Sequence, residues 1–246
     1  MKLLSTASSD QTPKVGAIVI AAFLGYLGGQ IAATVLTIVG VHLSGYPGGL
    51  SALGRALAPP WWANALGLVG LWCGFGAAIY YAYVHGHLRT TPGQWRPRVS
   101  DLGYVALGVA CQLVVDLAYR PFHPPSLDRP VHHLFAAAHG AGFVLLIVMT
   151  VVLAPVMEEW LFRGVIYRGV AQGGAGRGSV VRAVALSAVL FALAHAELVQ
   201  FVGLAFLGVV LAVLVARSGR LVPSIVTHVS FNAVAVLALL AQRSGH

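Results

Sequence analysis

Residues 154–164, which read APVMEEWLFRG, place two adjacent carboxylates and an arginine inside an otherwise apolar stretch. The chain has seven acidic residues, and its glutamates, Glu158, Glu159 and Glu197, all fall within the window 158–197. In a membrane, a charged side chain near the bilayer centre costs roughly 2.5–3.5 kcal/mol on insertion scales. Two neighbouring glutamates in such a stretch therefore call for a charge partner, a water-filled cavity or a chemical role.

The composition around this stretch is that of a membrane protein. Of 246 residues, 58% are hydrophobic and 9% are charged, whereas an ordinary soluble domain is about 25% charged. The net charge of +8 does not indicate nucleic-acid binding, because the basic residues lie at the ends of apolar runs, where they bias orientation. Cys73 and Cys111 form neither a disulfide framework nor a CxxC zinc spacing. The sequence predicts an all-α, polytopic helical bundle.

The apolar runs predict about seven transmembrane helices, since each span needs about 20 apolar residues. The first run is too long for a cleavable signal peptide and is interpreted as a retained anchor. Without internal repeats or long linkers, residues 1–246 are expected to form a single membrane domain. The predicted spans are 15–39, 62–84, 102–119, 141–166, 181–199, 200–216 and 222–241.

The distribution of basic residues predicts the orientation, because short cytoplasmic loops are enriched in Lys and Arg. With a cytoplasmic N-terminus, the outer side receives four of the fifteen basic residues, namely Arg55, Arg120, Arg129 and Arg243. The remaining eleven lie on the cytoplasmic side. We therefore expect the loops 85–101, 167–180 and 217–221 to face the cytoplasm.

Three polar sites punctuate the last hundred residues of the chain. They are Glu158-Glu159 with Arg163, then His195 in the segment 191–195, then His228 with Asn232. At 1.5 Å per helical residue, the histidine His195 lies roughly 20 Å along a helix from Arg182, and the other sites reach comparable depths from their nearest arginines. The three sites are therefore predicted to meet in one layer of the membrane, displaced toward the cytoplasm.

Helical spacing assigns faces to these residues. Residues four apart share a helix face and immediate neighbours do not, so Arg163 is expected to pair with Glu159 and leave Glu158 facing a cavity. A partly desolvated Glu158, together with His195, could activate a water molecule. His228 and Asn232 lie four apart and could donate two hydrogen bonds to one oxyanion. Water, base and oxyanion donors together describe amide hydrolysis.

Each polar signal also has a structural explanation. Histidine and asparagine in transmembrane helices commonly form hydrogen bonds between helices, and an i,i+4 pair of Glu and Arg can simply order its helix. The main alternative is therefore a non-proteolytic membrane scaffold or sensor protein. A transporter is a more distant alternative, because the two halves of the chain lack paired interrupted helices.

These motifs resemble those of the CPBP intramembrane proteases, which include the type II CAAX prenyl endopeptidases and bacteriocin-processing relatives. The EExxxR element corresponds to residues 158–163, the FxxxH element to 191–195 and the HxxxN element to 228–232. The resemblance covers about residues 141–240, which are expected to carry the catalytic core. It implies a membrane-embedded endopeptidase in which Glu158 and His195 activate water, while His228 and Asn232 form the oxyanion site.

The expected cofactor requirement follows from two readings of the same residues. Glu158, His195 and His228 could form a His₂Glu zinc set, but a zinc ion would remove His228 from its pairing with Asn232, and the chain lacks HExxH. We therefore expect hydrolysis without an obligatory metal, with Zn²⁺ as the alternative. The expected partners are the lipid bilayer and a peptide or lipid-modified protein substrate, in a prokaryotic plasma membrane.

Overall fold

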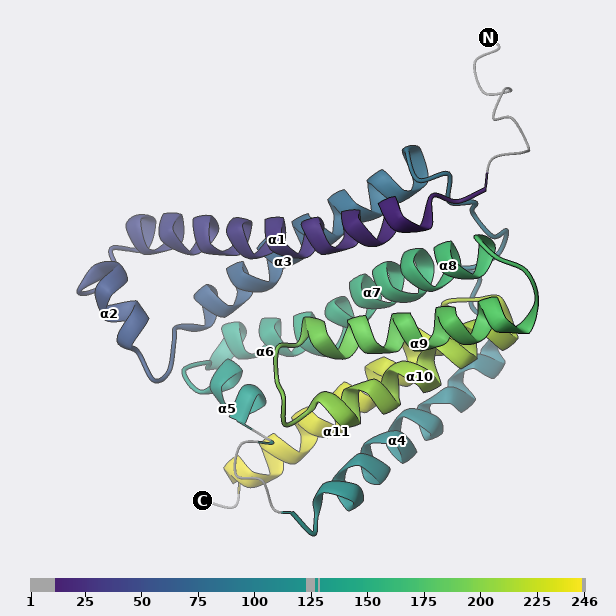
Figure 1. Ribbon diagram of the computed structural model, residues 1–246. Helices are drawn as coiled ribbons and strands as arrows, with labels where there is room; N and C mark the ends of the chain where they lie inside the picture. Colours follow the sequence, from purple (N-terminus) through teal and green to yellow (C-terminus); the bar gives the residue numbers. More distant parts are fainter. Residues whose placement is uncertain (1–11, 123–126, 128, 245–246) are drawn as a thin grey trace.

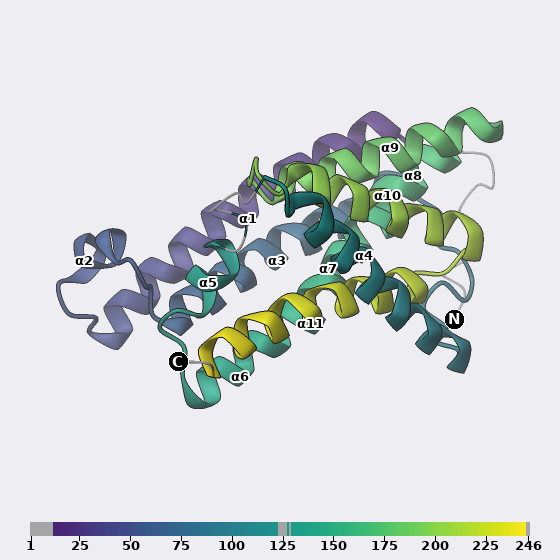
Figure 2. The same cartoon turned by 90° about the horizontal axis from the view of Figure 1, so that it is seen from below.

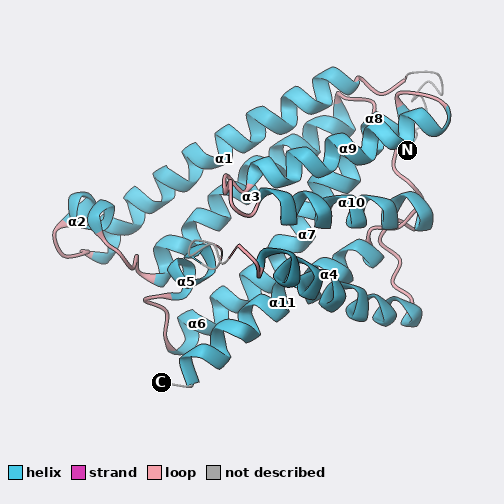
Figure 3. Cartoon of the chain, turned by 60° about the horizontal axis from the view of Figure 1, so that its bottom comes forward, coloured by secondary structure: helices cyan, strands magenta, loops and turns pink. Residues whose placement is uncertain are grey.

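The computed structural model of the protein describes residues 12–122, 127 and 129–244. Within these ranges the chain forms helices, turns and loops and no strand (Figure 3). The helices, in chain order, are α1 (Val15–Ser44), α2 (Gly49–Arg55), α3 (Trp61–Val84), η1 (Val99–Gly103), α4 (Tyr104–Tyr119), α5 (Arg129–Phe135), α6 (Gly140–Val148), η2 (Met149–Leu153), α7 (Ala154–Glu159), η3 (Trp160–Tyr167), α8 (Arg168–Gln172), α9 (Gly176–Ala194), α10 (Phe201–Ser218) and α11 (Val222–Ser244).

Seven helical stretches in the described ranges are long and apolar enough to cross a membrane, which confirms the predicted fold class. They are 15–44, 61–84, 99–119, 140–172, 176–194, 201–218 and 222–243. Many large apolar side chains point outward, including Ile20, Phe23 and Ile31 on α1. Such a surface would be unusual in water and is suited to contact with lipid.

The helices pack in pairs, of which α1–α3 and α9–α10 are antiparallel and α4–α11 is parallel (Figure 1). Helix α1 lies along α3, α9 along α10, and α4 along α11, and the long stretch α6–α8 runs between these pairs (Figures 1 and 2). The first pair is held by close backbone contact at Gly25, Gly29, Gly70 and Gly74. A Cβ atom at Gly74 would lie 2.0 Å from the carbonyl oxygen of Gly25. Small residues at this spacing allow transmembrane helices to approach closely.

The fourth span is longer than predicted and is not a uniform α-helix. Its segments η2 and η3 are π-helical, and they flank the short α-helix α7 that ends at Glu159. π-Helical turns inside α-helices occur frequently at functional sites. The motif Glu158-Glu159 therefore lies at the junction between an α-helical and a π-helical segment.

The predicted loop 167–180 is wrong, because the chain remains helical to Gln172 and α9 already begins at Gly176. Two of the arginines counted on the cytoplasmic side, Arg177 and Arg182, lie exposed on the first turns of α9. Long basic side chains can extend from a helix end to the membrane surface, so their positions do not mark a break in the helix.

The fifth span is also displaced relative to the prediction of 181–199. Helix α9 ends at Ala194, and His195 follows as its C-terminal cap. The next residue, Ala196, adopts a left-handed conformation with φ of 54°, which turns the chain toward α10. His195 therefore lies at a helix end, beside the turn that contains the exposed Glu197.

Candidate active site

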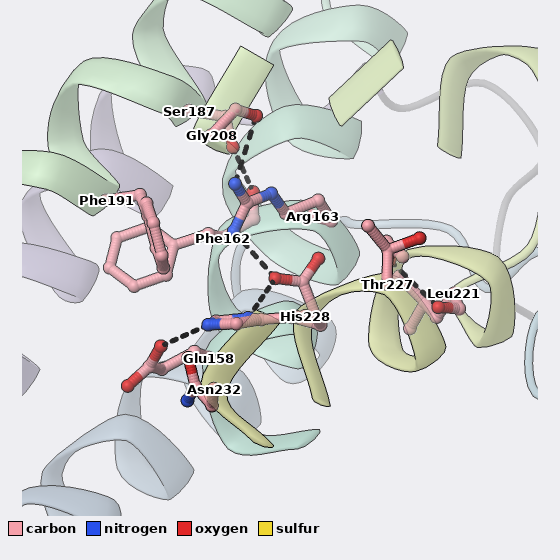
Figure 4. A network of polar contacts seen from close by, with 12 residues as sticks. Glu158, Phe162, Arg163, Ser187, Phe191, Gly208, Leu221, Thr227, His228 and Asn232 are labelled. Carbon is pink, nitrogen blue, oxygen red and sulfur yellow. Dashed lines mark hydrogen bonds and ion pairs between the residues drawn. The ribbon is translucent and has the colours of Figure 1, made fainter. Parts of the chain in front are cut away.

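The polar residues of the fourth and seventh spans meet in the interior of the bundle (Figure 4). The side chain of Glu159 is completely buried. Its Oε1 accepts a hydrogen bond of 2.8 Å from Arg163 Nη1 and lies 3.0 Å from Nδ1 of His228. The predicted ion pair between Glu159 and Arg163 is therefore present, and His228 extends it to α11.

Arg163 joins this pair to the neighbouring helices. Its Nη2 donates a hydrogen bond of 3.0 Å to the carbonyl oxygen of Gly208 on α10. Its guanidinium also lies 4.5 Å from the ring centroid of Phe191 on α9. A Cβ atom at Gly208 would lie 2.9 Å from Cα of Ala188, so the glycine lets α9 and α10 approach around the arginine.

Glu158 lies in a different environment from its neighbour. Its side chain is 16% exposed, and its Oε2 lies 3.7 Å from Nε2 of His228. The two nitrogen atoms of His228 thus face two carboxylates, Glu159 on one side and Glu158 on the other. This arrangement places an imidazole, itself only 2% exposed, between a fully buried carboxylate and a partly accessible one.

His195 reaches the site indirectly. Its Nδ1 lies 2.9 Å from the carbonyl oxygen of Phe191, one turn earlier in its own helix. Among the described residues, no hydrogen bond or ion pair joins His195 directly to Glu158, and the water molecule expected between the two stays a prediction. The two histidines instead flank Phe191, whose ring centroid lies 4.8 Å from the ring of His195 and 5.4 Å from that of His228.

Asn232 lies one turn after His228 on α11, as the spacing predicts, and Figure 4 shows it beside Glu158. Its Nδ2 donates a hydrogen bond of 3.0 Å to the carbonyl oxygen of Thr150. Thr150 lies in the π-helical segment η2, where the regular backbone ladder of the helix is interrupted. One of the two N–H groups of the Asn232 amide is therefore engaged, and the other remains.

The sequence reasoning missed the residues that hold the polar side chains in place. Ser187 donates a hydrogen bond of 2.8 Å to the carbonyl oxygen of Phe162 and ties α9 to η3. Phe191, Gly208 and Thr150 contribute a ring or a backbone carbonyl, which no side-chain motif reveals. Only Phe191 carried a signal, since it is the first residue of the FxxxH spacing.

The side chains considered for a zinc site do not converge. Among the described residues, no group of three or more His, Cys, Asp or Glu side chains is placed to hold a metal ion. His228 places Nδ1 against Glu159, and His195 places Nδ1 against the carbonyl oxygen of Phe191. Metal-ligating histidines commonly make such contacts with the nitrogen that does not bind the metal. In the described structure Glu158, His195 and His228 are therefore not gathered around one point, and it is this spacing, not the Nδ1 contacts, that disfavours a zinc ion.

Comparison with known proteins finds a similarity within the C-terminal region of the chain. Residues 140–234 match the family model described as type II CAAX prenyl endopeptidase Rce1-like, which confirms the resemblance inferred from the motifs. No curated protein and no solved structure gives a significant match. The family match and the seven apolar helices together identify an integral membrane protein and support intramembrane endopeptidase activity in general.

Proposed function

We propose that this protein is an intramembrane endopeptidase that hydrolyses a peptide bond in a membrane-associated protein or peptide. The unequal environment of the two adjacent glutamates carries this proposal. Glu159 is fully buried and contacts two cationic or polar partners, whereas Glu158 is partly exposed and has its nearest polar contact at 3.7 Å. Glu159 is thereby suited to a structural role and Glu158 to a chemical one.

Glu158 is the proposed general base. The separation of 3.7 Å between its Oε2 and Nε2 of His228 exceeds a direct hydrogen bond. Polar groups at such distances are often bridged by water. In the proposed reaction Glu158 takes a proton from this water while the water oxygen attacks the substrate carbonyl carbon. Glu158 then returns the proton to the amine nitrogen as the C–N bond breaks.

His228 is the proposed first oxyanion donor. An ionised carboxylate only accepts hydrogen bonds, so Nδ1 of His228 carries a proton when it contacts Glu159. The proposed role places a second proton on Nε2, so that the ring and Arg163 balance the negative charges of Glu158 and Glu159. The Nε2–H group can then donate to the oxyanion of the tetrahedral intermediate, in a site where water is largely excluded.

Asn232 and His195 complete the proposed site. The second N–H of the Asn232 amide is the second oxyanion donor, since the first is bonded to Thr150. A backbone carbonyl only accepts, so Nδ1 of His195 donates to Phe191, and Nε2 of the neutral ring is an acceptor. We assign to this Nε2 the role of orienting the second hydrogen of the attacking water.

The substrate class follows from the family to which the C-terminal region is similar. That family is described by its action on prenylated CAAX proteins, and we extend this to lipid-modified or membrane-associated peptides as substrates of this chain. We place the protein in a prokaryotic plasma membrane with a cytoplasmic N-terminus, and assign the catalytic core to residues 141–240. Hydrolysis without an obligatory metal remains our proposal, with zinc as the alternative.

One observation favours a scaffold as the second candidate function. The same polar groups also tie helices together: Arg163 bonds to α10, Ser187 to η3, and Asn232 to η2. Contacts of this kind stabilise transmembrane bundles without any chemistry. A scaffold would keep its function after a near-isosteric change at Glu158, whereas an enzyme would not.

The test compares Glu158→Gln with Glu197→Gln, a matched change at the exposed glutamate of the α9–α10 turn. Loss of a general base typically lowers turnover by about 10²–10⁴-fold, so Glu158→Gln should abolish processing while the folded protein persists. The measurement is a comparison of the membrane-associated peptides that accumulate in cells carrying each variant. A Glu158→Gln protein that stayed monodisperse and fully active would support the scaffold instead.

A further inference from the structure

A pocket with a largely apolar lining lies next to the fourth span, on the connection between α3 and η1. It has a volume of about 480 Å³ and is lined by Tyr83, Trp160 and the loop residues 90–96. Trp160 directly follows Glu159, so one wall of this pocket belongs to the helix that carries the proposed base. The proposed reaction uses none of the residues that line the pocket.

The loop that forms the pocket is fixed to the fourth span. Arg168 of α8 donates hydrogen bonds to the Thr91 hydroxyl and to the carbonyl oxygen of Gly219. Gln172, also in α8, exchanges two hydrogen bonds of 3.2 Å with the backbone of Arg89. These contacts tie the beginning of the loop to the end of the catalytic helix.

The end of the same loop is fixed to the turn between α10 and α11. The backbone N–H of Leu221 donates to the carbonyl oxygen of Gln94 at 2.8 Å. Arg220 donates to the carbonyl oxygen of Arg96 at 3.1 Å and forms two hydrogen bonds of 2.7 Å with Asp101. A loop held at both ends presents a preformed pocket, and a preformed site loses less entropy when it binds a ligand.

The lining combines aromatic surface with unsatisfied polar atoms. The rings of Trp95 and Trp160 pack edge to face at 5.3 Å. Three lining residues carry a buried polar atom that has no hydrogen-bond partner in the described part of the chain, namely Tyr83 Oη, Gln94 Oε1 and Trp160 Nε1. Buried polar groups are normally paired, so each of these atoms calls for a partner from outside the chain.

The chemistry of these atoms defines the ligand. The indole N–H of Trp160 can only donate, and the amide oxygen of Gln94 can only accept. A ligand that satisfies both must present an acceptor and a donor close together, as a peptide group does. Arg96, whose side chain is exposed and makes no hydrogen bond to another described residue, adds a positive charge to the lining. This charge favours a ligand that carries a carboxylate.

We propose that this pocket binds a carboxylate-bearing peptide segment of the substrate, outside the bond that is cleaved. A peptide group bridges Trp160 Nε1 and Gln94 Oε1, the aromatic rings contact an adjoining side chain, and Arg96 binds the carboxylate. The carboxylate is either the C-terminus of the peptide or an acidic side chain. The proposal rests on the proposed endopeptidase function, because it describes how that enzyme would hold a part of its substrate away from the cleaved bond.

Binding is measured without proteolysis, in a Glu158→Gln protein that lacks its native cysteines. The variant Thr90→Cys places a thiol in the pocket, and Ser100→Cys places a control thiol on η1, at an exposed position outside it. The probes are three short acetylated peptides: a neutral C-terminal amide, the same peptide with a free C-terminal carboxylate, and an amide that contains one glutamate. The readout is the rate of alkylation by a polar maleimide.

The carboxylate-bearing peptides should protect the Thr90→Cys thiol, and the neutral amide should protect it much less. By mass action, a peptide at about ten times its Kd slows alkylation roughly tenfold. The Ser100→Cys thiol should react at an unchanged rate. Protection by the free C-terminus alone identifies a terminal carboxylate as the recognised group, whereas protection by both charged peptides shows that an acidic side chain also binds.

Two substitutions test the assigned contacts. Trp160→Phe keeps an aromatic ring but removes the N–H donor, and it should weaken protection by both charged peptides. Arg96→Gln should remove the advantage of the charged peptides over the amide. Unchanged alkylation with all three peptides at millimolar concentration would overturn the proposal, as would full protection in both substituted proteins.

The outcome is separable from the fate of the proposed enzyme activity. If the peptides protect the Thr90→Cys thiol but the protein with native Glu158 cleaves no substrate, the docking pocket stands and the endopeptidase proposal fails. If that protein cleaves its substrate and Trp160→Phe and Arg96→Gln leave KM unchanged, the docking pocket fails alone.

Discussion

Replacing Arg163 by methionine tests the assignment of Glu159 as the structural member of the glutamate pair. The change removes the 2.8 Å contact with Glu159 and the 3.0 Å contact with the Gly208 carbonyl, both at positions without solvent exposure. Methionine fills a similar volume, so the main effect is electrostatic. The carboxylate of Glu159 then keeps its contact with His228.

The size of the expected loss in the free energy of unfolding distinguishes the loss of a charge partner from the loss of a hydrogen bond. Removing one partner of a buried ion pair costs about 3–5 kcal/mol, whereas a hydrogen bond between transmembrane helices averages about 0.6 kcal/mol and reaches about 1.7 kcal/mol. Arg163→Met should therefore lower the free energy of unfolding by about 3–5 kcal/mol. Arg163→Lys keeps the charge but cannot reach Glu159 and Gly208 together, so its loss should stay below about 2 kcal/mol.

The assay is reversible unfolding in mixed micelles, with the folded fraction followed by near-UV circular dichroism. A double variant, Arg163→Met with Glu159→Gln, removes both charges and provides the matched control. The free energy of unfolding lost by the double variant should be smaller than the sum of the losses of the two single variants by about 1–3 kcal/mol, because each single change leaves the other charge unpaired. Strictly additive losses, or an Arg163→Met protein as stable as the parent, would refute the buried-pair reasoning.

Three further predictions concern topology, packing and metal. In a cysteine-free background, Ala175→Cys should resist an impermeant thiol reagent applied to intact cells, whereas Leu198→Cys should react. The two positions flank opposite ends of α9 and therefore face opposite sides of the membrane. The reverse labelling would contradict a cytoplasmic N-terminus. Gly74→Ala should destabilise the protein by about 1–3 kcal/mol through overpacking against α1, whereas Gly76→Ala on the same helix meets no atom within 4 Å and should be neutral or stabilising. Elemental analysis of active protein should find far less than one zinc per chain, and Asn232→Ala should lower turnover by roughly 10²–10³-fold; stoichiometric zinc, with activity lost on chelation and restored by zinc alone, would decide for the metal alternative.

The fold was predictable because its determinants are local. A span is defined by the length of an apolar run, and the structure confirms all seven runs. The pair of Glu159 and Arg163 was equally predictable, since side chains that are four residues apart lie on the same face of a helix. Both predictions depend on sequence separations of a single helix and need no knowledge of how helices pack.

The remaining features depend on packing between helices, which the spacing of residues does not encode. Nothing in the sequence indicates that His228, rather than His195, lies nearest to Glu158, because this depends on how α9 and α11 approach the fourth span. The end of α9 at Ala194 was missed because only a short segment, residues 195–200, separates it from the apolar run of the next helix. The π-helical segments around α7 likewise have no simple sequence signature.

The position of His228 explains why the two glutamates are adjacent in the sequence. Consecutive residues on a helix point about 100° apart, so Glu159 can be directed into the packed interior toward Arg163 while Glu158 borders a more accessible space. The two ring nitrogens of an imidazole lie on different edges of the ring, and one histidine can therefore contact both carboxylates. Glu159 fixes the orientation of His228 through Nδ1 and thereby directs Nε2 toward Glu158. A glutamate placed three or four residues from Glu159 would lie over the same face and compete for Arg163, whereas the immediate neighbour shares the histidine without sharing the arginine.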